Sequence, residues 1–136
     1  MVKFGGGCAC GAIRYAAEGE PVVMFACHCT DCQKANGGGP SHEVIMPTEG
    51  FKLLKGNPDV YWVKADSGNR LGRSFCGACG TPVFVELKDR PEIRAISAGS
   101  LDDPAVFAPK IHIWTRSALP WHQINSALPR YEKQPF

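Results

Sequence analysis

Short apolar runs, some alternating with polar residues, recur along the chain and are separated by Gly, Pro, Asn or Asp. This spacing of turn residues is typical of β-strands. One segment, residues 30–35, has helical character, and Thr30 is its expected N-cap. The pattern therefore predicts a mainly β protein with one short helix. The expected strands are 12–17, 22–26, 43–46, 51–54, 60–65, 71–75, 81–87, 93–98 and 111–114.

Composition limits the classes of function that need consideration. The 136 residues contain 44% hydrophobic and 21% charged residues, and no repeat or linker interrupts them, so we expect one domain over residues 1–136. Lys and Arg are scattered and the formal net charge is +2, which gives no support to nucleic-acid binding. No apolar run is long enough to span a membrane, so we expect no membrane partner.

Seven cysteines in three tight groups are the strongest chemical signal. Thiolates two or three residues apart can share one cation, and zinc is the usual guest of such sites. Because seven is four plus three, the count suggests one closed site and one open site, and up to two zinc ions per chain. The groups are Cys8 and Cys10, then Cys27, Cys29 and Cys32, then Cys76 and Cys79.

A disulfide framework is the alternative reading of these cysteines. It fits less well, because the N-terminus lacks the basic and apolar pattern of a signal segment and an odd count leaves one thiol unpaired. We therefore expect a cytoplasmic protein whose thiols stay reduced.

Glycines indicate which cysteines share a metal. Gly11 follows Cys10 and Gly80 follows Cys79, and a glycine there allows positive φ and turns backbone N–H groups toward the sulfurs. Two such zinc knuckles predict a structural zinc site made of Cys8, Cys10, Cys76 and Cys79. The middle group lacks these glycines, and three ligands with a free position are the catalytic pattern.

The middle group has a second interpretation, a structural site completed by a histidine. The candidates are His28, His42, His112 and His122, of which His28 is the least suited because it stands between two cysteines. The predicted helix would place Cys32 in its first turn, which favours the thiolate. The glycines at 37–39 end that helix, and a plain loop is favoured there over a ligand contact.

Together the motifs resemble the glutathione-dependent formaldehyde-activating enzyme family. The resemblance implies a β-tent fold of small antiparallel sheets stapled by the four-cysteine zinc site. It assigns Cys27, Cys29 and Cys32 to a catalytic zinc, and it implies a carbon–sulfur lyase that condenses formaldehyde with glutathione to S-hydroxymethylglutathione. The matching segments are Gly7–Gly11 with Ile13 and Tyr15, Cys27–Lys34, Phe75–Thr81, and Ile111–Trp114 through Pro120 and Trp121.

Adduct formation needs a proton donor, and a histidine is the natural one. His112 and His42 are the candidate acid/base residues, although a structural role is favoured for either. Two functions follow: an aldehyde–thiol lyase, or a non-catalytic zinc-scaffolded binding module, which a fourth protein ligand in the middle group would favour. The other candidates are expected to be ordinary solvated charges (Lys34, Arg70, Arg73, Lys110) or core aromatics (Trp62, Trp114, Trp121).

Overall fold

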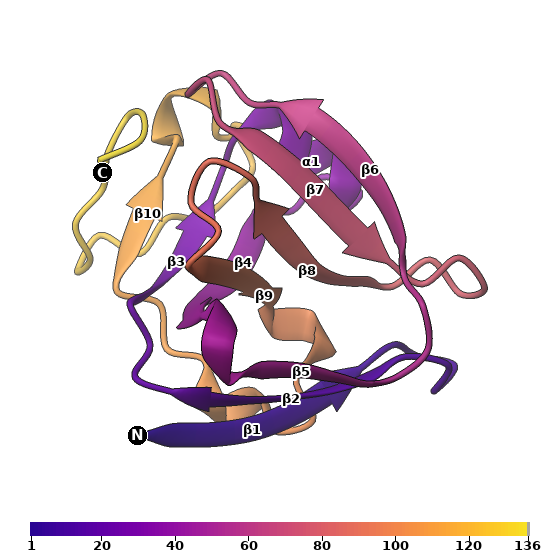
Figure 1. Ribbon diagram of the computed structural model, residues 1–136. Coiled ribbons are helices and arrows are strands. Elements are labelled where there is room, and N and C mark those ends of the chain that lie inside the picture. Colours follow the sequence, from indigo (N-terminus) through magenta and orange to yellow (C-terminus); the bar gives the residue numbers. More distant parts are fainter. Residues whose placement is uncertain (136) are drawn as a thin grey trace.

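The computed structural model describes residues 1–135, which form two β-sheets and one short α-helix. The first sheet has the strand order β1-β2-β5 and the second the order β10-β3-β4-β9-β8-β7-β6 (Figure 1). The strands are β1 Val2–Gly7, β2 Arg14–Gly19, β3 Val23–Cys27, β4 Ser41–Pro47, β5 Phe51–Lys55, β6 Asp59–Lys64, β7 Arg70–Phe75, β8 Pro82–Leu87, β9 Ile93–Ser97 and β10 Ile111–Ile113; the helix is α1 Thr30–Ala35. Short 3-10 turns lie at Thr48–Gly50, Ala98–Ser100, Pro104–Val106 and Thr115–Ser117.

The prediction of a mainly β fold with one short helix is confirmed, with one difference in topology. All neighbouring strands pair antiparallel except β3 and β10, which run parallel. Parallel neighbours require a long crossover, and here β3 and β10 are separated by most of the chain. Local strand patterns carry no information on such a distant pairing.

The main core fills the space between the two sheets, where the three-stranded sheet crosses below the larger one (Figure 1). Tyr15 of β2 is 1% exposed and stacks on Phe51 of β5, with ring centroids 5.3 Å apart. Phe51 in turn meets Phe84 of β8 edge to face at 4.9 Å. These aromatic contacts hold the sheets together from the inside.

The opposite face of the larger sheet carries a second apolar cluster. Successive side chains of β4 point to opposite faces of the sheet. Val44 and Met46 therefore lie in the main core, and Ile45 lies in the second cluster. Burial on both faces explains why residues 44–46 read as a continuous apolar run. The second cluster also contains Cys27 and Cys32.

Strand β1 was not predicted, because its sequence ends in three glycines that read as a loop. The pairing with β2 explains them. A Cβ at Gly6 would meet the Ser100 carbonyl oxygen and the Tyr15 hydroxyl, and one at Gly7 would meet the Ile13 carbonyl oxygen. The glycines therefore permit a close approach of backbones within a regular strand.

Two of the three tryptophans are not core residues. Trp114 is buried, as expected, but Trp62 is 48% and Trp121 is 67% exposed. Trp62 covers the outside of the sheet, where its ring lies against Gly72 of β7.

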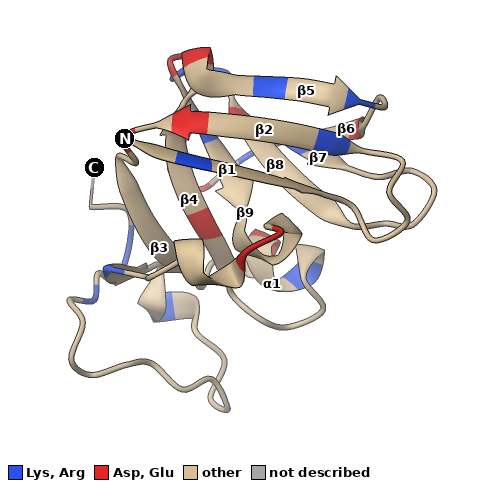
Figure 2. Ribbon diagram, turned by 90° about the horizontal axis from the view of Figure 1, so that it is seen from below, with Lys and Arg blue, Asp and Glu red and all other residues tan. Residues whose placement is uncertain are grey.

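Charged residues of both signs are spread over the strands and loops (Figure 2). In the described part of the chain, no helix combines the length and the apolar character needed to cross a membrane.

Candidate metal centres and the adjoining cavity

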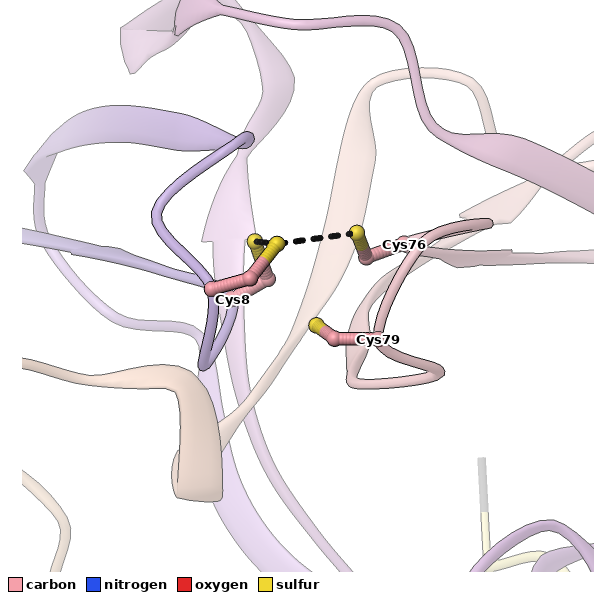
Figure 3. A group of neighbouring side chains, drawn as sticks. Cys8, Cys76 and Cys79 are labelled. Carbon is pink, nitrogen blue, oxygen red and sulfur yellow. Dashed lines mark hydrogen bonds between the residues drawn. The ribbon is translucent and has the colours of Figure 1, made fainter.

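Two turns from different sheets bring four cysteines together. Cys8 and Cys10 lie in the turn between β1 and β2, and Cys76 and Cys79 lie in the turn between β7 and β8. Figure 3 shows Cys8, Cys76 and Cys79 pointing toward one another from the two turns. Their ligand atoms, with that of Cys10, all lie within 4.8 Å of one another.

The two turns have the geometry that the glycines predict. Gly11 and Gly80 both have a φ of +80°, and a Cβ on either would meet nothing within 4 Å, so the backbone angle and not lack of space favours glycine. The backbone N–H groups that follow them, of Ala12 and Thr81, donate to the sulfurs of Cys10 and Cys79. Both turns are therefore zinc knuckles in form.

Thr81 joins the two knuckles directly. Its hydroxyl accepts a hydrogen bond from the backbone N–H of Ala9 at 3.1 Å and lies 3.2 Å from the sulfur of Cys79. Hydrogen bonds from the Thr81 hydroxyl and backbone N–H lower the pKa of Cys79 to about 5. This thiol is thus prepared to be a thiolate ligand at neutral pH.

The sulfur spacing fits a tetrahedral metal site. The Cys8 and Cys10 sulfurs are 3.6 Å apart and those of Cys10 and Cys76 are 3.7 Å apart. Zinc–sulfur bonds of about 2.3 Å place tetrahedral sulfurs about 3.8 Å apart, whereas a disulfide bond measures about 2.05 Å. All seven cysteines are free, so the four-cysteine group fits zinc and no disulfide framework is present.

The middle cysteines come from one continuous segment. Cys27 ends β3, Cys29 caps α1 and Cys32 lies in the first turn of α1. The predicted bounds of α1 are confirmed, but the expected N-cap was wrong: the Cys29 sulfur, not the Thr30 hydroxyl, accepts from the backbone N–H of Cys32, at 3.4 Å. The thiol thus takes over a role that a hydroxyl usually has.

The three sulfurs of this group also lie within 4.8 Å of one another. Within residues 1–135, no histidine or carboxylate joins them as a fourth potential ligand. Hydrogen bonds from Cys27 and then Cys32 lower the pKa of Cys29 to about 3. Hydrogen bonding with Cys29 and Cys32 raises the pKa of Cys27. One thiolate is therefore stabilised by its two neighbours.

A cavity of about 440 Å³ opens beside these three cysteines. Arg73 of β7 and Glu43 of β4 line it, and an Arg73 Nη2 lies 3.6 Å from the Cys32 sulfur. Burial, and then the charge of Cys32, raises the pKa of Glu43 to about 8. Sequence reasoning missed Glu43, although an acidic residue opening an apolar strand was a usable signal, and it wrongly expected Arg73 to be an ordinary solvated charge.

The histidines lie on the other face of the sheet. On β10, Ile111 and Ile113 line the cavity, and His112 between them points away from it. On β4, Glu43 lines the cavity and its neighbour His42 points away from it. Neither His42 nor His112 lines the cavity, so this placement does not support the acid–base role expected for them. Burial lowers the pKa of both.

His28 occupies the face opposite its cysteine neighbours. It is 1% exposed, and its Nε2 lies 3.0 Å from Nδ1 of His112. The His122 ring lies against it at a tilt of 59°, with ring centroids 5.5 Å apart. His28 and His112 are buried and His122 is half-buried, so these histidines form a cluster behind the three cysteines.

The remaining candidates stay outside the cavity. Lys34 and Lys110 are exposed, as expected, and Arg70 pairs with Asp89 at 2.6 Å. The glycine loop contacts the C-terminal segment instead of the cavity, since the Gly38 carbonyl oxygen lies 2.5 Å from Nε2 of His122. The plain-loop interpretation therefore agrees with the structure.

The sequence profile of the glutathione-dependent formaldehyde-activating enzymes matches residues 3–117, which include every cysteine. The chain belongs to this family. The crystal structure of a Rhodobacter sphaeroides protein is similar in fold, with a TM-score of 0.56 and 14% sequence identity over 93% of this chain and 98% of that one. The family resemblance expected from the motifs is thus confirmed, and the structure adds a cavity next to the three-cysteine group of this formaldehyde-activating enzyme relative.

Proposed function

We propose that this protein is a zinc-dependent carbon–sulfur lyase that forms or cleaves an aldehyde–thiol adduct. The proposal depends on one observation: three cysteines converge at the wall of a cavity, and no fourth protein ligand accompanies them among the described residues. Three protein ligands and a free position distinguish catalytic from structural zinc sites. The family name supplies the first pair of substrates to test, glutathione and formaldehyde.

The two cysteine groups divide the roles. Cys8, Cys10, Cys76 and Cys79 would hold a structural zinc, and Cys27, Cys29 and Cys32 would hold a catalytic one. A zinc ion bound by the middle group supplies Lewis acidity, which keeps a substrate thiol deprotonated at neutral pH.

The chain's own residues bind and orient the reactants. The apolar walls exclude water, and confining thiol and aldehyde in one cavity makes their encounter effectively intramolecular. In the forward direction the sulfur attacks the carbonyl carbon, the C=O double bond becomes a single bond, and the oxygen takes up a proton. Of the carboxyls that line the cavity, Glu43 is the acid/base candidate, because it is buried and interacts electrostatically with Cys32 and Arg73.

The rival function, a non-catalytic zinc-scaffolded module, has less support. It expects a fourth protein ligand that closes the middle site, and residues 1–135 provide none within reach of all three sulfurs. We also propose that residues 1–136 work as one domain. Seven free thiols are best preserved in a reducing compartment such as the cytoplasm.

The test compares the zinc-loaded protein with its Cys29→Ser variant. Exchange NMR on labelled formaldehyde measures how fast the S-hydroxymethyl adduct forms and breaks with glutathione, 2-mercaptoethanol and an aryl thiol. We expect the wild-type protein to accelerate exchange with at least one thiol and the variant to leave the uncatalysed rate unchanged. Equal rates for both proteins across the whole panel would remove the lyase proposal.

A further inference from the structure

The cavity wall is built from apolar side chains of six different strands. Phe25, Ile45, Leu71, Leu87, Ile93 and Ile113 come from β3, β4, β7, β8, β9 and β10 in that order. Leu71, Leu87 and Ile93 are only half-buried, so apolar surface is open to the cavity. Such surface gains free energy when an apolar group covers it.

An aromatic side chain closes the wall next to the cysteines. Trp114 follows β10 in the left-handed conformation, with a φ of 56°. Its indole N–H donates to the Gln134 side-chain oxygen at 2.9 Å, and both residues line the cavity. Since the indole N–H is already paired, the ring offers an apolar surface to a ligand.

The charges on the wall do not favour an anionic ligand. Three acids, Asp31, Glu43 and Asp66, line the cavity with two bases, Arg73 and Arg90. The raised pKa of Glu43 leaves it largely uncharged at neutral pH, so the wall carries no excess of positive charge. Arg90 Nε lies 2.5 Å from a Glu92 carboxylate oxygen. Arg73, whose Nη2 lies 3.6 Å from the Cys32 sulfur, is therefore the cation that the wall offers to a ligand. No lysine or histidine is among the residues that line the described cavity.

Glutathione matches this wall poorly. At neutral pH it carries two carboxylates and one ammonium group and is a net anion. Binding would remove two carboxylates from water against a wall on which Arg73 could pair with one of them, and the other would be left without a cation, which is costly to desolvate. A volume of about 440 Å³ accommodates a small molecule, so the wall's chemistry, not its size, opposes the tripeptide.

We propose that the thiol substrate of this site is an uncharged apolar thiol, alkyl or aryl, and not glutathione. This inference rests on the aldehyde–thiol chemistry proposed above and narrows its substrate class. The apolar substituent of the thiol lies against Leu71, Leu87 and Ile93 while its sulfur lies at the three cysteines. The thiol sulfur bonds to the carbonyl carbon and its proton ends on the carbonyl oxygen, so no oxidant or reductant is needed.

Binding to the zinc-loaded full chain tests the inference without depending on turnover. Titration calorimetry compares 2-phenylethanethiol, 2-mercaptoethanol and glutathione. Each methylene-sized group buried against the wall raises affinity about fourfold, so we expect the aryl thiol to bind at least about thirtyfold more tightly than 2-mercaptoethanol. Glutathione should bind no more tightly than 2-mercaptoethanol.

A matched pair of variants locates the effect. Leu87→Gln puts an amide into the wall at nearly constant size, whereas Leu54→Gln makes the same change on β5, where Leu54 is 64% exposed and outside the cavity. We expect Leu87→Gln to weaken aryl-thiol binding about tenfold and to leave 2-mercaptoethanol binding unchanged. Leu54→Gln should change neither affinity.

The outcomes separate this inference from the proposed function. If glutathione binds as tightly as the aryl thiol and adduct exchange runs with it, the apolar-thiol inference fails and the lyase stands. The inference also fails if Leu87→Gln weakens both small thiols equally, because the wall then does not select the substituent. If no thiol binds and none exchanges, the lyase and the apolar-thiol inference fall together.

Discussion

Replacement of Cys79 by serine is the sharpest test of the four-cysteine group. Cys79 stands in the β7–β8 turn, and its partners Cys8 and Cys10 stand in the β1–β2 turn of the other sheet. The serine hydroxyl is a far weaker zinc ligand than a thiolate, so the substitution leaves three ligands. The zinc that would join the β1–β2 turn to the β7–β8 turn is then bound more weakly. We expect Cys79→Ser to be insoluble or to unfold at a much lower temperature than the wild type.

The size of the effect follows from the energy of metal binding. A structural zinc contributes roughly 10 kcal/mol in small peptides, and a whole domain is stable by about 5–15 kcal/mol. If each of the four ligands carries an equal share, losing one costs at least about 2.5 kcal/mol. At about 3–4 °C per kcal/mol for a domain of this size, the melting temperature falls by about 8 °C or more.

The assay pairs zinc content with thermal unfolding, and Cys29→Ser is the matched control. That variant makes the same atomic change in the middle group, where serine still serves as an N-cap for α1. It should lose the second zinc and keep its melting temperature within about 2 °C of the wild type, because the cap is preserved. A soluble Cys79→Ser protein with wild-type zinc content and melting temperature would show that the four cysteines are not a structural site.

Three further outcomes are expected. Thr81→Val removes the hydroxyl between Ala9 and Cys79 at constant shape and should lower zinc affinity by about 10–100-fold in chelator competition; unchanged affinity would exclude that role. Burial raises the pKa of Tyr15 to about 12 from 10, so stability that is complete below pH 10 should fall between pH 10 and 12 as the unfolded state loses its proton. Tyr15→Phe should lack that fall, and parallel wild-type and variant curves from alkaline denaturation would contradict the cause. Mild chelation should remove one zinc first while circular dichroism stays unchanged, and simultaneous loss of both metals and the fold would argue against two kinds of site.

The sequence was most informative where chemistry is local. The glycines after Cys10 and Cys79 predicted the positive φ of both knuckles, and the helix over residues 30–35 was predicted to the residue. These features depend on a few neighbouring positions. Their steric rules hold whatever the rest of the chain does.

Features set by distant pairing were not accessible. The Gly5–Gly7 run pairs with β2, and the Ser100 carbonyl oxygen, from far along the chain, lies where a Cβ on Gly6 would be. His42 and Glu43 are neighbours on one strand, and only the pairing of β4 with β3 and β9 decides which one faces the cavity. A strand pattern gives the alternation of faces but not which face is which.

The two cysteine groups differ in how much of the fold surrounds them. The four-cysteine group takes its residues from turns of both sheets, so a metal bound there would link the two sheets. The middle group takes its three cysteines from residues 27–32, and that segment is held by hydrogen bonds of its own. The His28 N–H donates to the Ile113 carbonyl at 3.0 Å, and the Gln33 side chain donates to the His28 carbonyl at 2.9 Å. The His28 ring also lies against His112 behind the sheet, so contacts within the chain hold this segment in place. If the middle group holds the proposed catalytic zinc, these contacts would let the site exchange its ligand or its metal without unfolding of the domain.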